Sequence, residues 1–191
     1  MRAREVCGLK TEESSGFRWQ PWARFSVEQL SLNQKDALKG NMKNLFDQIT
    51  VDEIKQRFNQ LRPTSTALWG KMDPAQMLAH CSATIEIALG KPSQPRILLG
   101  RLLGPLAKRS LLVKGEPMRR NAMTEASCLV TDDRNYKAER LRFFELMDRF
   151  WAGGPSGCTN HPHFFFGRLT PLEWATLMYS HLDHHLRQFN C

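Results

Sequence analysis

The sequence lacks a long uninterrupted apolar run, and this absence argues against a membrane-spanning protein. Its most apolar stretch, residues 97–113, is broken by Arg101, Lys108 and Arg109, and such charges are costly in the core of a bilayer. The first 30 residues contain no apolar segment of the kind that a secretory signal needs. We therefore expect no membrane partner.

The sequence also lacks paired cysteines. Its five cysteines are an odd number, and no two of them lie closer than 30 residues in the chain. This spacing fits neither a disulfide framework nor a zinc knuckle. Reduced thiols are typical of a cytoplasmic protein, which is the localisation that we expect.

A dense basic cluster is missing as well, although the formal net charge is +8. The excess of lysine and arginine is spread along the chain and forms no dense cluster with interleaved aromatic residues, whereas nucleic-acid interfaces concentrate their charge. We interpret the charge as a solvated surface and expect no nucleic-acid partner. Anion or nucleic-acid binding remains the alternative, and salt-sensitive retention on DNA would reveal it.

Residues 1–41 differ from the rest, because no hydrophobic period in them lasts for two helical turns. We interpret them as a mostly disordered extension and residues 42–191 as one domain. Met42 would then be a natural first residue. The alternative for residues 1–41 is a short helix that docks on the domain.

Helix start and stop signals divide residues 42–191 into four amphipathic segments. The pairs Thr50/Glu53, Asp73/Gln76 and Thr170/Glu173 have the spacing of capping boxes, and proline follows Asp73 and Thr170 directly. Leu141, Phe144, Met147 or Leu146, and Trp151 mark the apolar side of the third segment. The predicted helices begin at Thr50, Asp73, about residue 134 and Thr170, and end before Pro63, before Gly90, near Trp151 and at Gln188.

A long connection, residues 91–133, separates the second and third predicted helices. Leu98, Leu99, Leu102, Leu103 and Leu106 favour a short amphipathic turn or helix within it. We favour packing across the helices over a membrane-surface role, because the polar face is sparse. Four helices, no strand pairs and one long crossover are typical of an all-α four-helix bundle.

Three of the six histidines lie in the last predicted helix. At about 100° per residue, His181 and His185 fall on the edge of the apolar stripe and His184 points closer to water. Residues four apart are neighbours on a helix, so His181 and His185 can share one metal ion.

His80 is the candidate third ligand, because it occupies the matching edge of the second helix. A metal site of His80, His181 and His185 would leave one coordination position open. The competing interpretation is a hydrogen-bonded core histidine at position 80 and an ordinary surface residue at position 181. We expect the loop histidines His161 and His163 to be solvated, with a place at the site entrance as the alternative.

The chain from Leu45 to Phe189, about three-quarters of the sequence, resembles the DinB-like superfamily of metal-binding four-helix bundles, specifically an uncharacterised branch of it. The segments that carry the resemblance are WGKM (69–72), AQMLAHC (75–81), EPM (116–118), NAMT (121–124), FGRLT (166–170), EW (173–174) and HLDHHLRQF (181–189).

The resemblance implies an up-down-down-up bundle in which His80, His181 and His185 bind a divalent metal ion. Zinc or nickel is expected, with iron or manganese as alternatives, and His184 is an alternative ligand. Characterised relatives include thiol-dependent transferases and a thiol-dependent isomerase. An enzyme with a small-molecule substrate and a low-molecular-weight thiol is therefore one hypothesis. A non-catalytic metal-binding, interaction or homodimerisation module is the other, and His184 or His161 as a fourth ligand would favour it.

Overall fold

The computed structural model describes residues 42–191, and this part of the chain is all-helical. The prediction of a disordered extension over residues 1–41 lies outside the described residues. The long helices are α2 (Gln48–Phe58), α3 (Pro74–Ala88), α4 (Leu98–Leu112), α5 (Tyr136–Gly153) and α6 (Pro171–Gln188). Two short 3-10 helices, η2 (Ala126–Cys128) and η3 (Gly154–Gly157), complete the described structure.

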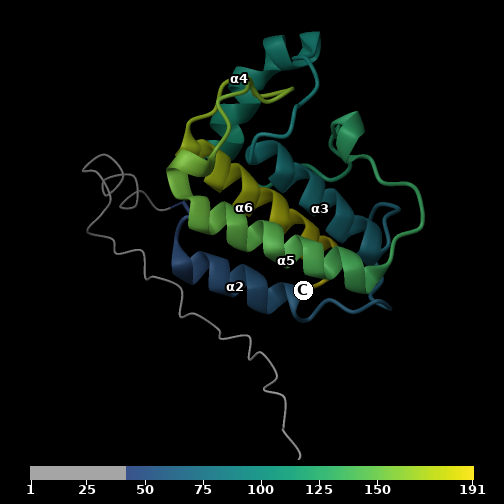
Figure 1. Cartoon of the computed structure of the whole chain (residues 1–191). Coiled ribbons are helices and arrows are strands. Elements are labelled where there is room, and N and C mark those ends of the chain that lie inside the picture. The colour runs from purple at the N-terminus through teal and green to yellow at the C-terminus, as the bar shows by residue number, and fades with distance from the viewer. Residues whose placement is uncertain (1–41) are drawn as a thin grey trace, which may run out of the picture.

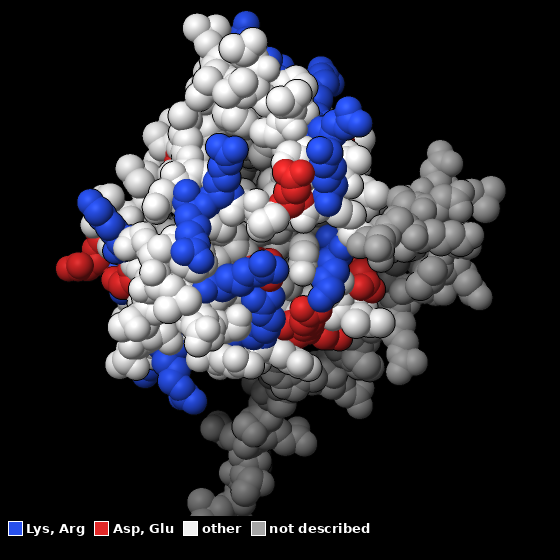
Figure 2. All heavy atoms as spheres, turned by 180° about the vertical axis from the view of Figure 1, so that it is seen from behind, with Lys and Arg blue, Asp and Glu red and all other residues white. Residues whose placement is uncertain are grey.

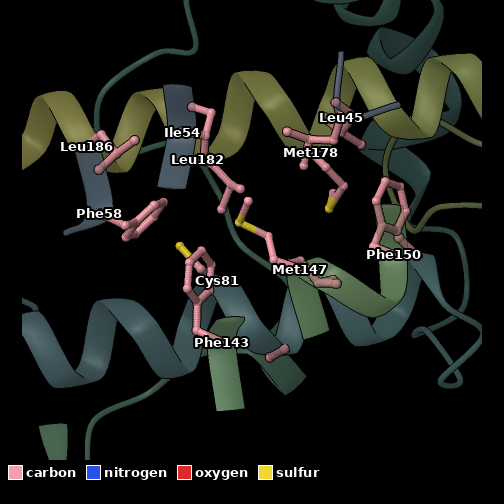
Figure 3. Close-up of a cluster of buried hydrophobic side chains, with 14 of the residues drawn as sticks. Leu45, Ile54, Phe58, Cys81, Phe143, Met147, Phe150, Met178, Leu182 and Leu186 are labelled. Atoms are coloured by element: carbon pink, nitrogen blue, oxygen red, sulfur yellow. The ribbon is translucent and has the colours of Figure 1, made fainter. Parts of the chain in front are cut away.

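The helices α2, α3, α5 and α6 lie side by side, and α4 lies at one end of them (Figure 1). Their apolar faces meet in one core, where α3 makes its most extensive contacts with α5. Figure 3 shows side chains from α2, α3, α5 and α6 pointing toward one another in this core. Among its fully buried members are Phe58, Met77, Phe143 and Leu182. Burying such side chains contributes about 1.5–3 kcal/mol each, so this core is the main source of stability.

The predicted capping boxes of α3 and α6 are confirmed. The side chain of Asp73 accepts a hydrogen bond from Gln76 N at 2.8 Å, and Thr170 Oγ1 accepts one from Glu173 N at 3.2 Å. The predicted start of α2 at Thr50 is wrong. Asp47 caps this helix instead, by accepting hydrogen bonds from the backbone of the first turn and from the Thr50 hydroxyl.

The apolar side of α5 is also rotated from the prediction. Phe143, Met147 and Phe150 are its fully buried residues, whereas Leu141 is 63% exposed. The spacing of four and three residues between the buried positions is the ordinary helical repeat. Hydrophobicity alone predicts a core position for Leu141, but its place on the helix puts it on the exposed side.

The long connection between α3 and α5 contains α4, a full helix whose leucines do not pack as predicted. Leu98, Leu102 and Leu106 are 80%, 78% and 76% exposed, and Gly100 and Gly104 are buried instead. A Cβ atom at Gly104 would lie 2.4 Å from the carbonyl oxygen of Phe165, so only glycine allows this close backbone approach. The glycine face thus holds α4 against the 163–167 turn.

None of the helices within residues 42–191 is long and apolar enough to cross a membrane. Figure 2 shows one face of the molecule, on which basic side chains are more frequent than acidic ones and the two kinds are interspersed.

Candidate metal centre

Two capped helices, α3 and α6, position the three candidate ligands. His80 lies in the second turn of α3, and His181 and His185 lie one turn apart near the end of α6. Leu182 and Leu186, the residues that follow these two histidines, are completely buried. Their burial sets the rotation of α6 and directs His181 and His185 toward α3.

The three imidazoles meet through their Nε2 atoms. His181 Nε2 lies 3.0 Å from His80 Nε2 and 3.2 Å from His185 Nε2. One nitrogen of each ring lies within 4.8 Å of the others, and all three side chains are buried. We call these residues the histidine cluster.

Hydrogen bonds on the far side of each ring indicate which nitrogen carries the proton. His80 Nδ1 lies 2.8 Å from the carbonyl oxygen of Cys128, which can only accept a hydrogen bond. His185 Nδ1 lies 2.8 Å from Gln188 Oε1. The amide nitrogen of Gln188 donates to the carbonyl oxygen of Trp69, which assigns the amide orientation. Both rings therefore carry their proton on Nδ1.

The same holds for His181. Its Nδ1 lies 3.3 Å from Thr84 Oγ1, and the Thr84 hydroxyl donates its own hydrogen to the carbonyl oxygen of Cys81. Thr84 thus accepts from His181 Nδ1–H. Outer-shell acceptors of this kind orient histidine ligands in metal sites.

The donor set fits one divalent ion. Three Nε2 lone pairs face one another without a hydrogen between them, so their mutual repulsion favours a cation at that point. Two nitrogens bound at ~2.1 Å to one ion lie roughly 3.0–3.4 Å apart, depending on the coordination geometry. The two short Nε2 separations of the cluster fall in this range.

A family model described as a protein of unknown function, DUF1569, matches residues 41–191. This match covers well over half of the 191-residue chain. The chain belongs to the DUF1569 family. No curated protein and no solved structure matches it.

Burial keeps the three histidines of this DUF1569 domain neutral. It lowers the pKa of His80, lowers that of His185 to about 3, and lowers that of His181 well below its ordinary value. Metal ligation requires neutral imidazole, so these rings need not release a proton at neutral pH before they bind an ion.

The other candidate histidines lie outside the cluster. His184 is half-buried and its ring packs edge-on against Trp69, with 5.6 Å between the ring centroids. His161 is exposed on its loop, as predicted. Within residues 42–191, the group of metal-ligand side chains contains three histidines and no fourth member.

The expectation that His163 is solvated is wrong, whereas the alternative that it lies at the site agrees with its place in the lining of the cavity beside the cluster. Its ring lies among those of Phe164, Phe166 and Trp174, and its Nδ1 accepts hydrogen bonds from the backbone of Phe165 and Phe166. The surrounding aromatic residues in the sequence were the one available signal. Cys81, predicted as a core thiol, is fully buried, and burial raises its pKa.

A cavity of about 680 Å³ opens beside the histidine cluster of the DUF1569 domain. His80, His181 and His185 all line it, so an ion bound there could be reached by a small molecule. Pockets of 300–1,000 Å³ are the usual size for such ligands.

Proposed function

We propose that the histidine cluster binds one divalent metal ion and forms the working centre of an enzyme, a thiol-dependent transferase. The observation that carries the proposal is the convergence of three Nε2 lone pairs beside an open cavity. Three protein ligands with an open position are typical of catalytic sites, whereas structural zinc sites normally have four.

The protein residues have separate roles in this proposal. His80, His181 and His185 hold the ion, and Cys128 O, Thr84 and Gln188 orient the three rings through their Nδ1–H groups. A bound divalent ion would supply Lewis acidity and lower the pKa of a water or thiol. Zinc or nickel suits the imidazole ligands best, with iron or manganese as alternatives.

The reaction class follows from the resemblance to the DinB-like superfamily. In a thiol transfer, the sulfur forms a bond to an electrophilic carbon, the leaving group departs with the bonding electrons, and the thiol proton is released. The substrates would be a small electrophile and a low-molecular-weight thiol. We also propose that α2, α3, α5 and α6 form a DinB-like, up-down-down-up four-helix bundle, and that the protein works in the cytoplasm without a nucleic-acid or membrane partner.

One feature favours a second candidate function, a non-catalytic interaction module. Leu98, Leu102 and Leu106 form an exposed apolar row on α4, and such rows occur at protein interfaces. A homodimer joined through α4 would cover them. Light scattering of the wild type and of Leu102→Lys tests this: a dimer that the substitution converts to a monomer supports the interaction module.

Elemental analysis of the full chain, purified without a histidine tag, tests the metal centre. We expect about one ion per chain in the wild type and in the exposed-loop control His161→Gln, and less than about 0.1 in His80→Gln and His185→Gln. Circular dichroism would establish that the variants are folded. A metal content below 0.1 in the wild type after incubation with zinc and with nickel would refute the centre.

Turnover is tested separately with metal-loaded protein, glutathione or cysteine, and 1-chloro-2,4-dinitrobenzene as electrophile. We expect thioether formation above the uncatalysed rate, and its loss in His80→Gln. Turnover that does not depend on the added thiol would exclude the transferase. A bound metal with no turnover for any thiol and electrophile pair would favour the interaction module.

A further inference from the structure

The cavity beside the histidine cluster has one polar end and a long apolar wall. Its polar lining includes the three histidines of the cluster, together with His163, His184 and Gln188. The helix α4 contributes Leu103, Ala107 and Leu111, which line the cavity with their apolar side chains. These residues lie on the same side of α4 as the two glycines that pack on the 163–167 turn, and the exposed leucines lie on the other side.

Two further segments extend the apolar wall. Leu177 and Met178 of α6 line the cavity one turn before His181, and both are nearly completely buried. Phe164 and Phe165 line it from the 163–167 turn. A ligand bound at the histidines would therefore extend along hydrocarbon and aromatic surface.

The acidic side chains at the cavity are already engaged. Glu125 is buried and accepts hydrogen bonds from Ser93, Gln94 and Ser127. Glu116 is bonded to Ser110 and Lys114.

The basic lining residues are Lys71 and Arg119, and both are exposed. The lining residues of α4, apart from Ser110, are apolar, and the turn adds three phenylalanines, 164–166. Burying a polar group without a partner is costly, so this arrangement selects an apolar ligand body.

We propose that the cavity binds small molecules with one metal-binding polar end and an apolar body, the body lying between α4, α6 and the 163–167 turn. The position of the polar end rests on the proposed metal centre, whereas the apolar site itself does not. The electrophile of the proposed reaction would then be an apolar compound.

A series of alkyl hydroxamates tests the proposal, because the hydroxamate group chelates divalent ions and only the chain varies. Isothermal titration of the zinc-loaded full chain would use the acetyl, butanoyl, hexanoyl and octanoyl members. Each buried methylene is expected to tighten binding about three- to fourfold. Equal affinities along the series would overturn the apolar site.

A second probe separates the apolar site from the metal. N-phenyl-1-naphthylamine, an uncharged fluorescent dye, needs no ion and should bind the metal-free protein at one site. Octanohydroxamate should displace it from the zinc-loaded protein, whereas acetohydroxamate should not. Failure of the dye to bind, or displacement by both compounds alike, would contradict the proposal.

Variants locate the site. Ala107→Phe fills the cavity and should weaken octanohydroxamate at least tenfold with little effect on acetohydroxamate. Leu103→Asp should weaken octanohydroxamate binding to a similar extent. Leu103 is partly exposed, so this substitution should disturb folding less. Ala152→Phe, on the exposed side of α5, is the matched control and should change neither.

The outcomes for the two sites are distinguishable. Dye binding that Ala107→Phe abolishes, combined with hydroxamate binding that zinc does not affect, would refute the metal centre and leave the apolar site standing. The opposite outcome is zinc-dependent binding of every hydroxamate with affinities that Ala107→Phe and Leu103→Asp do not alter. It would support the metal centre and refute the apolar site.

Discussion

The imidazole of His163, which packs among aromatic rings, leads to a quantitative prediction about stability and pH. Burial lowers the pKa of His163 to about 4, from an ordinary value of 6.5. Its Nδ1 accepts hydrogen bonds from the backbone N–H groups of Phe165 and Phe166. Protonation would place a hydrogen on that acceptor and disrupt both bonds, which is a second reason for the low pKa.

The direction in which stability changes with pH follows from proton binding to His163 in the folded and unfolded states. Between pH 6.5 and about 4 the unfolded chain holds a proton on His163 and the folded chain does not, so stability decreases as the pH decreases. One pKa unit corresponds to about 1.4 kcal/mol, so the loss is about 2 kcal/mol at pH 5 and about 3 kcal/mol when both states are protonated.

Urea unfolding at pH 7.5 and pH 5.0, with metal removed by a chelator, would measure this contribution. We expect His163→Asn, whose carbonyl oxygen can still accept the two backbone hydrogen bonds, to lose about 2 kcal/mol less than the wild type over this interval. His161→Asn is the control, because His161 is exposed two residues away. An identical pH dependence for wild type and His163→Asn would refute the assignment.

Three further predictions concern the framework of the site. Gly104→Ala should destabilise the protein by about 1–3 kcal/mol, because its Cβ would clash with the backbone of the turn below α4. Gly153→Ala, which meets no atom within 4 Å, should be neutral or stabilising by up to about 1 kcal/mol; urea midpoints compare the two. Gln188→Met removes the acceptor of His185 Nδ1–H and should weaken zinc binding roughly 10–100-fold in a chelator competition, and unchanged affinity would exclude an orienting role. Thr170→Ala removes the cap of α6 and should cost about 1 kcal/mol of unfolding free energy, measured by the same midpoints.

Local sequence signals sufficed for the helices that carry the histidine cluster. The caps at Asp73 and Thr170 act on backbone groups within the same turn, so residue types and spacing reveal them. Helical periodicity likewise placed His181 and His185 on the buried side and His184 nearer to solvent.

The features that the sequence did not reveal depend on contacts between distant segments. The exposure of the α4 leucines follows from the fit of Gly104 against Phe165, about 60 residues later in the chain. The acceptor for His80 is the carbonyl oxygen of Cys128, and every residue carries such a group. Gln188 was within reach of sequence reasoning, since it lies one helical turn after His185.

The distance between the cluster's members along the chain has a consequence for unfolding. His80 and His181 are 101 residues apart in sequence and 3.0 Å apart at Nε2. An ion bound to both histidines would cross-link the two ends of this long loop. A permanent cross-link across about 100 residues stabilises the folded state by up to ~4.7 kcal/mol, because it lowers the chain entropy of the unfolded state. A bond between the ion and a histidine can break, so the link would affect the rate of unfolding. The helices α3 and α6 could separate only after such a bond had opened. An ion bound at the cluster would then slow unfolding and leave the early folding of each helix unaffected.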